Sequence, residues 1–434
     1  MSLLQSIPSI FLDNGLEIKL KEIHSAPLIS SWVWYRVGSR DEIPGKHGIS
    51  HWVEHMQFKG TERHSPDDME KSVARSGGFW NAFTYLDWTT YFETMPADKI
   101  DLALDLEADR MINTTYDETE VESERTVVIS ERQGRENNPD FWLSEALHYA
   151  AFRIHSYNHA IIGDQVDLES IQRDDLLGHY KTFYSPNNAV VSIAGDFDKN
   201  RMLDRITELY QDIPAGEDPP RVNRPENPPR GEHRFTVEGP GDTILGDVAY
   251  HTPPASDPDF FPLLILDSVL SGPQGLNMFG GGGISNKTSR LYKRMVEETE
   301  VVVDIHGGLP ATIDPYLFSL NFILHPDSTT DEALKILDGE IQRLQDTPPE
   351  MEELQRAVKQ TQALFAYGGE SITNQAFWMG FSEMFASYEW VIKYLDNIAA
   401  VTPDDVQRVA QQYLQPKNRL VGIYRPHLKG NNNQ

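Results

Sequence analysis

The sequence contains no cysteine. Disulfide bonds therefore cannot stabilise the fold, and any metal site must be built from histidine, aspartate or glutamate. Long apolar runs are also missing, so we expect no transmembrane helix. No basic residue precedes Lys19, which argues against a secretory signal and against an arginine-rich transit peptide. These absences favour a cytoplasmic protein with no membrane partner.

Basic residues are few compared with acidic ones. The 434 residues include 38 Lys and Arg but 66 Asp and Glu, which gives a formal net charge of −28. Nucleic acid is excluded as an expected partner because phosphate binding requires a basic patch. The simpler interpretation of the negative charge is solubility, and the alternative is an acidic cavity that attracts basic peptides.

A proline-rich segment divides the chain nearly in half. Proline fixes φ and lacks a backbone donor, so a segment dense in proline and polar residues is typical of an extended linker. The prolines are Pro214, Pro219, Pro220, Pro225, Pro228 and Pro229. We therefore predict a first half over residues 1–213, a linker over 214–232 and a second half over 233–434.

The two halves end on the same pattern. Two aspartates, an aromatic residue followed by a proline turn with asparagine, and an apolar run occur in this order at matching spacings, in Asp174–Ala194 and again in Asp404–Tyr424. Each set predicts a helix, a turn and a terminal strand. The repeat indicates duplication. We expect two homologous α+β halves, each a largely antiparallel sheet covered by helices on one face.

The segment Gly48–Phe58 carries the strongest chemical pattern. Its residues His51, Glu54 and His55 have the i, i+3, i+4 spacing of one helical face, beside a core-facing stripe formed by Ile49, Trp52, Val53 and Met56. Side chains four residues apart on a helix have Cβ atoms about 5–6 Å apart. Two imidazoles so placed can bind one zinc ion at about 2.0–2.1 Å. The alternative is a polar helix face that happens to hold two histidines.

A catalytic zinc site normally uses three protein ligands and keeps one position open. The acidic helix predicted over Asp117–Glu131 is the natural source of the third ligand. Glu131 follows three β-branched residues, so we expect it to be half-buried, where a carboxylate needs a partner or a metal. Glu124 lies two turns earlier on the same face. Spacing alone does not decide which of the two glutamates is the third ligand.

At this point the sequence resembles the inverted-motif zinc metallopeptidases of the pitrilysin family, and in particular their small two-domain bacterial branch, which is similar to mitochondrial processing peptidase. The motif His-x-x-Glu-His is the inverse of the thermolysin order. Further segments resemble family signatures: Arg36–Glu42, Phe58–Thr61, Gly77–Gly78, Asn81–Thr84, Glu124–Val128 and Gly195–Asp196. The resemblance covers essentially the whole chain.

The resemblance implies a zinc endopeptidase that cleaves short extended peptides. It assigns Glu131 as the third zinc ligand beside His51 and His55, and Glu124 as a residue that supports the site. Glu54 is then the general base that takes a proton from the attacking water. In the second half, Ile265–Leu270 lies roughly where duplication would place the zinc helix, and it has no histidine. We therefore expect one Zn²⁺ per chain.

Gly77–Thr84 predicts a strand opened by two glycines. Its simple interpretation is a sheet edge, and edge strands are common. The resemblance implies in addition that a peptide substrate pairs with this edge near Asn81 and Ala82.

One departure from the family pattern concerns the second half. Relatives often carry an arginine followed seven residues later by a tyrosine, and both hold the substrate backbone. Here Arg294 occupies the first position, but Val301 occupies the second and has no side-chain donor. The resemblance therefore implies a heterodimer with a homologous zinc-free partner that closes a chamber; a homodimer is the alternative.

The run Gly280–Gly283 has two interpretations. The first is a flexible surface loop. The second follows from the resemblance, since mitochondrial processing peptidase has a glycine-rich loop that engages substrate in its non-catalytic subunit. A competing function for the whole chain is a non-catalytic assembly subunit of the same fold, of the kind found in the core of respiratory complexes.

Overall fold

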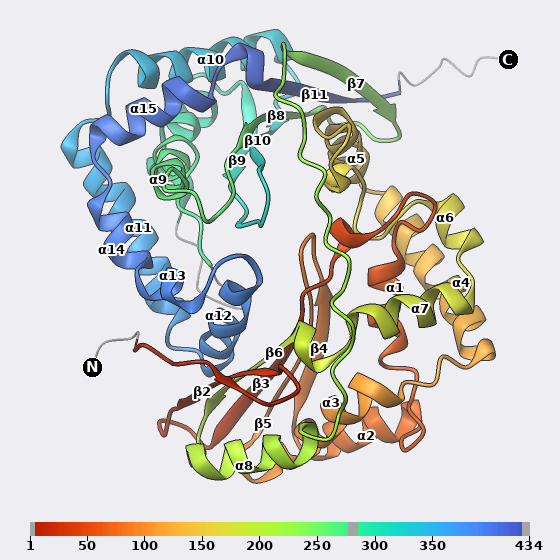
Figure 1. Cartoon of the computed structure of the whole chain (residues 1–434). Helices are drawn as coiled ribbons and strands as arrows, with labels where there is room; N and C mark the ends of the chain where they lie inside the picture. The colour runs from red at the N-terminus through yellow and green to blue at the C-terminus, as the bar shows by residue number, and fades with distance from the viewer. Residues whose placement is uncertain (1–4, 277–284, 428–434) are drawn as a thin grey trace, which may run out of the picture. The chain divides into compact units, whose positions relative to one another are not determined.

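The computed structural model describes residues 5–276 and 285–427. The run Gly280–Gly283 lies outside these residues. The described chain divides into two compact units, and each is made of several segments (Figure 1). The first unit comprises residues 1–132, 159–224 and 368–392, and the second comprises 133–158, 225–367 and 393–434.

The first unit is built on a six-stranded sheet. Its strands are β1 (Ile10–Phe11), β2 (Glu17–Glu22), β3 (Leu28–Tyr35), β4 (Phe79–Thr84), β5 (Thr89–Pro96) and β6 (Ala189–Gly195). They lie in the order β1-β2-β6-β3-β5-β4, and only the β2–β6 pair is parallel. The strand predicted over Gly77–Thr84 is confirmed as β4.

The helices of the first unit include those expected around the metal motif. They are α1 (Ile49–Met56), α2 (Pro66–Arg75), α3 (Ile100–Asn113), most of α4 (Glu118–Glu136), α6 (Gln165–Ser170), α7 (Arg173–Phe183), α8 (Lys199–Tyr210), α12 (Ile372–Phe385) and α13 (Tyr388–Ile392). The acidic helix predicted over 117–131 is therefore confirmed as α4, and it continues for five residues beyond Glu131.

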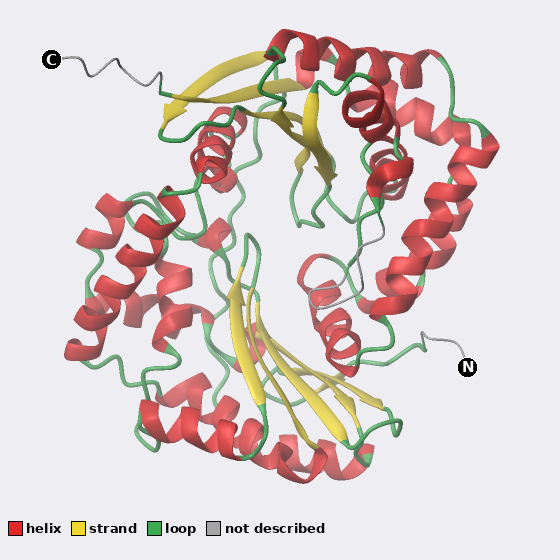
Figure 2. Ribbon diagram, turned by 180° about the vertical axis from the view of Figure 1, so that it is seen from behind, coloured by secondary structure: helices red, strands yellow, loops and turns green. Residues whose placement is uncertain are grey.

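The second unit contains a five-stranded sheet. Its strands are β7 (His233–Gly239), β8 (Leu245–Thr252), β9 (Val302–Gly308), β10 (Tyr316–Leu324) and β11 (Arg419–Pro426). Its main helices are α5 (Pro139–Ala151), α9 (Phe260–Leu270), α10 (Thr330–Asp346), nearly all of α11 (Met351–Gly368), α14 (Tyr394–Ala400) and α15 (Pro403–Tyr413), drawn in red in Figure 2.

The two sheets have the same topology, which confirms the predicted pair of similar halves. The second sheet has the order β7-β11-β8-β10-β9, and only its β7–β11 pair is parallel. Each strand except β1 thus has a counterpart: β2 with β7, β6 with β11, β3 with β8, β5 with β10 and β4 with β9. Helix α1 follows β3 in the first unit as α9 follows β8 in the second.

The sheet of the first unit carries helices on both faces, whereas we expected helices on one face. Strand side chains alternate between faces. Trp32 of β3 therefore points to one face, where it contacts Phe377 of α12 at 5.3 Å between ring centroids. Tyr35, three residues later in β3, points to the other face. There it stacks on Tyr184, which follows α7. Both faces of this sheet are apolar and need a cover.

Two helices make the compact units discontinuous in sequence. Helix α12 packs on β3 and β6 of the first sheet, although it comes from beyond residue 233. Helix α5 packs on β8 and β11 of the second sheet, although it comes from before residue 213. The first unit therefore contains a segment from outside the predicted range 1–213, and the second unit contains a segment from outside the predicted range 233–434.

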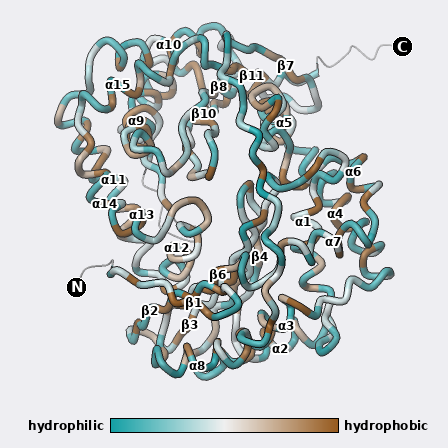
Figure 3. Tube along the Cα trace, viewed as in Figure 1, coloured by the Kyte–Doolittle hydropathy of each residue, from teal (hydrophilic) through white to brown (hydrophobic). Residues whose placement is uncertain are grey.

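The linker over 214–232 contains no helix or strand. Figure 3 shows it mainly in the hydrophilic colour. In the first unit its Arg221 donates hydrogen bonds to the carbonyl of Arg36 and to the Asn188 side chain, so the segment is held against the protein by side-chain contacts. None of the helices in the described ranges combines the length and the apolar character needed to cross a bilayer.

Candidate metal centre

A sharp turn sets the position of the helix that carries the metal motif. Gly48 caps α1 with a φ of 93°, in the left-handed region that favours glycine. A Cβ atom at Gly48 would also collide with the carbonyl oxygen of Ile162. The helix therefore begins at Ile49 with its apolar stripe in the core, and His51 and Glu54 are each only 8% exposed.

The structure brings His51, His55 and Glu131 together. One donor atom from each lies within 4.8 Å of the others. The Glu131 Oε2 atom is 3.8 Å from His51 Nε2 and 3.6 Å from His55 Nε2. These separations exceed a normal hydrogen bond of about 2.7–3.2 Å. Two imidazole nitrogens and a carboxylate at such spacing fit a zinc ion, whose ligand distances are about 2.0–2.2 Å.

Glu124 holds the second histidine from behind. Its Oε1 accepts a hydrogen bond of 2.7 Å from His55 Nδ1, which leaves His55 Nε2 facing Glu131. The carboxylate is buried, and burial raises its pKa, but hydrogen bonds from His55 and Lys59 together lower the pKa of Glu124 below its ordinary value. An ionised partner of this kind orients a ligating histidine and increases its basicity.

Glu54 stands beside this group, bonded to the neighbouring strand. Its Oε2 accepts a hydrogen bond of 2.7 Å from the Thr84 hydroxyl at the end of β4. Burial raises the pKa of Glu54 to about 7, although Thr84 and His55 lower it in part. A carboxylate whose pKa lies near neutrality is suited to accept and return a proton.

The substrate-binding residues expected in the first half lie on the terminal strand of the sheet. Strand β4 pairs only with β5 among the described strands, so its other edge is unpaired by the sheet. Asn81 is exposed on it, and its side-chain oxygen accepts from the backbone N–H of Ala82. Ala82 is buried. Helix α1 packs against this strand.

Arg294 belongs to the second unit, whereas His51 belongs to the first. It lies in a short π-helical segment, Tyr292–Glu298, where its Nη1 pairs with Glu298 Oε2 at 2.6 Å. Val301 is buried. The structure thus shows Arg294 in a local ion pair.

A second group of possible ligands lies in the loop before α1 and at the start of α6. Donor atoms of His47, Asp164 and Asp167 also lie within 4.8 Å of one another. Asp167 accepts the backbone N–H of His47 at 2.9 Å. This contact already gives Asp167 a structural role, because it holds the loop that leads into the metal helix.

Two residues of the site had no role in the sequence analysis. Thr84 bonds Glu54, and Lys59 bonds Glu124. Both lie within segments that resemble family signatures, so the sequence marked the segments without indicating these contacts. Neither spacing nor residue type indicates that a threonine thirty positions away would contact Glu54, because that contact depends on the packing of α1 against β4.

Two family models match the chain. Residues 18–165 match the family described as insulinase (peptidase family M16), and residues 170–361 match the peptidase M16 inactive domain. Similar proteins include an uncharacterized zinc protease of Streptomyces coelicolor, 28% identical over 95% of this chain and 88% of the relative. The mitochondrial-processing peptidase subunit beta of Lentinula edodes is 25% identical, with the same two coverages.

Solved structures share the fold. A protease from Helicobacter pylori superposes with a TM-score of 0.91 at 24% identity and covers 97% of this chain and 99% of its own. A peptidase M16 inactive domain from Pseudomonas fluorescens has a TM-score of 0.86 at 16% identity, with 98% of both chains covered. The matches to both M16 domains, the paired halves and the zinc-protease relatives lead to one conclusion: this chain belongs to peptidase family M16.

Proposed function

We propose that this chain is a zinc-dependent endopeptidase that hydrolyses short extended peptides. The observation that carries the proposal is the meeting of His51, His55 and Glu131 beside the buried carboxylate of Glu54. A zinc ion bound there would supply Lewis acidity to the substrate carbonyl and lower the pKa of a water molecule. The donor set and its spacing fit one such ion.

Glu54 is the proton carrier in this proposal. Its carboxylate takes a proton from the attacking water and passes it to the amine that leaves when the peptide bond breaks. The hydroxyl of Thr84 fixes one carboxylate oxygen, so the other remains available for the water. Burial keeps the pKa of Glu54 near 7, so proton acceptance and proton return are both accessible at neutral pH.

The substrate is an extended peptide that adds to the free edge of β4. Main-chain hydrogen bonds of an edge strand bind a peptide with little dependence on its sequence. Asn81 and Ala82 lie on this strand and Thr84 lies at its end, so a peptide paired with β4 passes close to Glu54. This proposal gives substrate binding to the backbone of the strand.

Hydrolysis of a quenched fluorescent peptide, with metal content measured in parallel, tests the activity. We expect turnover that a zinc chelator abolishes and added zinc restores. Activity that resists the chelator would contradict the zinc assignment. A library of unstructured peptides compared with folded proteins checks the substrate class, and cleavage of folded domains at equal rates would contradict it.

We further propose that a homologous zinc-free subunit completes the catalytic chamber. Val301 cannot donate the side-chain hydrogen bond that a tyrosine donates at this position in relatives. Co-purification with a similar chain, followed by the peptide assay, tests this. A homodimer is the alternative, and full activity of a monomer would contradict both.

A non-catalytic assembly subunit is the second candidate. The match of residues 170–361 to an inactive domain is consistent with it. Against it, donor atoms of His51, His55 and Glu131 lie within 4.8 Å of one another, and Glu54 on the same helix as the two histidines is buried. Bound zinc without peptide turnover, in the presence of every co-purifying partner, would favour this candidate over the enzyme.

A further inference from the structure

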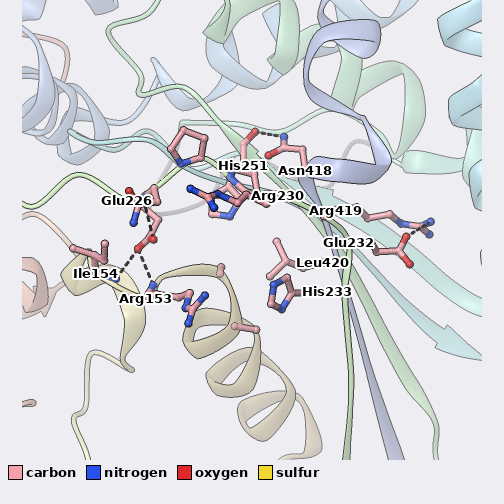
Figure 4. A pocket seen from close by; sticks show the side chains of 16 residues that line it. Arg153, Ile154, Glu226, Arg230, Glu232, His233, His251, Asn418, Arg419 and Leu420 are labelled. Atoms are coloured by element: carbon pink, nitrogen blue, oxygen red, sulfur yellow. Dashed lines mark hydrogen bonds and ion pairs between the residues drawn. The ribbon is translucent and has the colours of Figure 1, made fainter.

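An open cavity of about 640 Å³ lies in the second unit, between the end of α5, the last residues of the linker and the sheet (Figure 4). Its size is within the range of small-molecule sites, about 300–1,000 Å³. None of the candidate zinc ligands His51, His55 and Glu131 lines it. Basic side chains are prominent in its lining: Arg153, Arg230, His233, His251 and Arg419. This is unusual for a chain with a net charge of −28.

The linker is fixed over this cavity by one carboxylate. Glu226 Oε2 accepts the backbone N–H groups of Arg153, Ile154 and His155 at 2.7, 2.7 and 3.1 Å. Successive N–H groups that converge in this way bind anions. Burial raises the pKa of Glu226, but these hydrogen bonds lower it below its ordinary value, so the carboxylate is ionised at neutral pH. The wall of the cavity is thereby held in place.

The other acid of the lining is also neutralised within the protein. Glu232 pairs with Arg234, and its second oxygen lies 3.3 Å from Arg419 Nη1. Arg419 is buried and pairs in addition with Asp338 at 2.7 Å. Neither Glu226 nor Glu232 is therefore available to neutralise a further cation.

Two further guanidinium groups of the lining differ from Arg419, because they have no acidic partner among the described residues. Within the described ranges, the side chains of Arg153 and Arg230 make no ion pair or hydrogen bond to another residue. Both residues are exposed, so a ligand from solvent can reach them. In Figure 4 Arg230 lies beside His251, and Arg153 extends from the end of α5. Burial lowers the pKa of His251, so its ring is neutral and supplies one donor and one acceptor.

We propose that this cavity binds the phosphate group of a small molecule, through Arg153 and Arg230. Two planar guanidinium groups offer forked donors that match the several oxygens of a phosphate, and two positive charges match a dianion. A monoanion has less to gain from the two guanidinium groups, because their Coulomb attraction scales with the charge of the anion. The side chains of Ile154 and Leu420 provide apolar wall for the organic part of a phosphate ester.

Isothermal titration calorimetry of the full chain in phosphate-free buffer tests the site. The probes are inorganic phosphate, adenosine monophosphate and, as a dicarboxylate of equal charge, succinate. We expect one saturable site for phosphate probes. The double variant Arg153→Gln/Arg230→Gln should raise its Kd by about tenfold or more, because each lost guanidinium removes charge-assisted hydrogen bonds.

Matched controls separate this site from other causes. The variant Arg75→Gln/Arg201→Gln removes the same charge from exposed arginines of the first unit and should leave the Kd unchanged. His51→Ala should also leave it unchanged, which excludes phosphate held by a metal at the candidate centre. Tighter binding of adenosine monophosphate assigns a phosphate ester, and equal binding assigns free phosphate. Absence of saturable binding, equal binding of succinate, or an unchanged Kd in the Arg153/Arg230 variant would overturn the proposal.

Discussion

Helices α1 and α9 occupy corresponding places in the two sheets, yet only one carries a metal-binding pattern. Each packs against its terminal strand, α1 against β4 and α9 against β9. Each also buries one carboxylate, Glu54 in α1 and Asp267 in α9. Burial raises the pKa of both carboxyl groups to about 7. A buried acid against the edge strand is thus common to both halves.

The difference lies in what surrounds that acid. Glu54 has His51 and His55 on its helix and Glu131 across from them. Helix α9 is buried at every position, contains no histidine, and its Asp267 accepts a hydrogen bond from Ser271. Burial within this fold therefore raises the pKa of the acid in both halves. The two imidazoles and the distant carboxylate are what give the acid of α1 a possible metal site beside it.

The largest expected effect separates the two acids by function. Glu54→Gln should lower kcat about 10²–10⁴-fold, because the proton carrier is lost while the metal donors stay. Asp267→Asn should leave kcat within a few-fold of the unsubstituted protein. Steady-state peptide hydrolysis and zinc content check both variants. A similar loss in the two variants, or none in Glu54→Gln, would contradict the catalytic role given to Glu54.

The next effect distinguishes Glu124 from Glu131, two of the glutamates of α4. Glu131→Gln should abolish tight zinc binding, since it removes an anionic donor. Glu124→Gln should weaken zinc affinity about 10–100-fold, because it only orients His55. Competition with a chromophoric chelator measures both affinities. Reversed ranks would exchange the roles assigned to the two residues.

A third effect tests how closely Asp267 is packed against its edge strand. A Cβ at Gly307 of β9 would lie inside contact distance of Asp267 Oδ1 and Ser271 Oγ. Gly307→Ala should therefore reduce the free energy of unfolding by about 1–3 kcal/mol. Gly308→Ala is the matched control, because no atom lies within 4 Å of its Cβ position, and it should change stability by less than about 0.5 kcal/mol. Chemical denaturation distinguishes them.

The fourth effect is the pH dependence that Asp267 imposes on stability. Its pKa rises from 3.8 in the unfolded chain to about 7 in the folded protein. The folded state therefore keeps a proton that the unfolded state releases, so this contribution to stability is full below pH 4 and is lost as pH rises to 7. The variant Asp267→Asn should not lose stability in this way as pH rises, because an amide side chain does not titrate.

Relative to the unsubstituted protein, Asp267→Asn should gain on the order of 2 kcal/mol in unfolding free energy between pH 5 and pH 8. Urea denaturation at the two pH values measures this gain. A constant difference between the two proteins would show that Asp267 is ionised in the folded state at pH 5.

The sequence predicted the local part of this comparison. Periodicity placed His51, Glu54 and His55 on one helical face, and the matching chain ends indicated the duplication that the two sheet orders confirm. Spacing alone left the choice between Glu131 and Glu124 open. That choice depends on how α4 packs behind α1, which is long-range information that residue spacing does not contain.

The cover of the first sheet also escaped prediction. Helix α12 is apolar on several sides, so its sequence shows that it is buried but not against what. Gly380 gives the only local hint, because a Cβ there would collide with the indole of Trp34. A glycine in a helix is consistent with close packing, but the identity of the neighbour appears only in the folded chain.

This arrangement has a consequence for biosynthesis. Trp32 and Trp34 are completely buried, and the helix that shields them lies far downstream in the chain. At about 5–20 residues translated per second, the ribosome delivers that helix on the order of ten seconds or more after the last strand of the sheet. Until residues 372–385 have been synthesised, the nascent chain therefore lacks the helix that covers the indoles of Trp32 and Trp34, and this apolar surface is prone to aggregation.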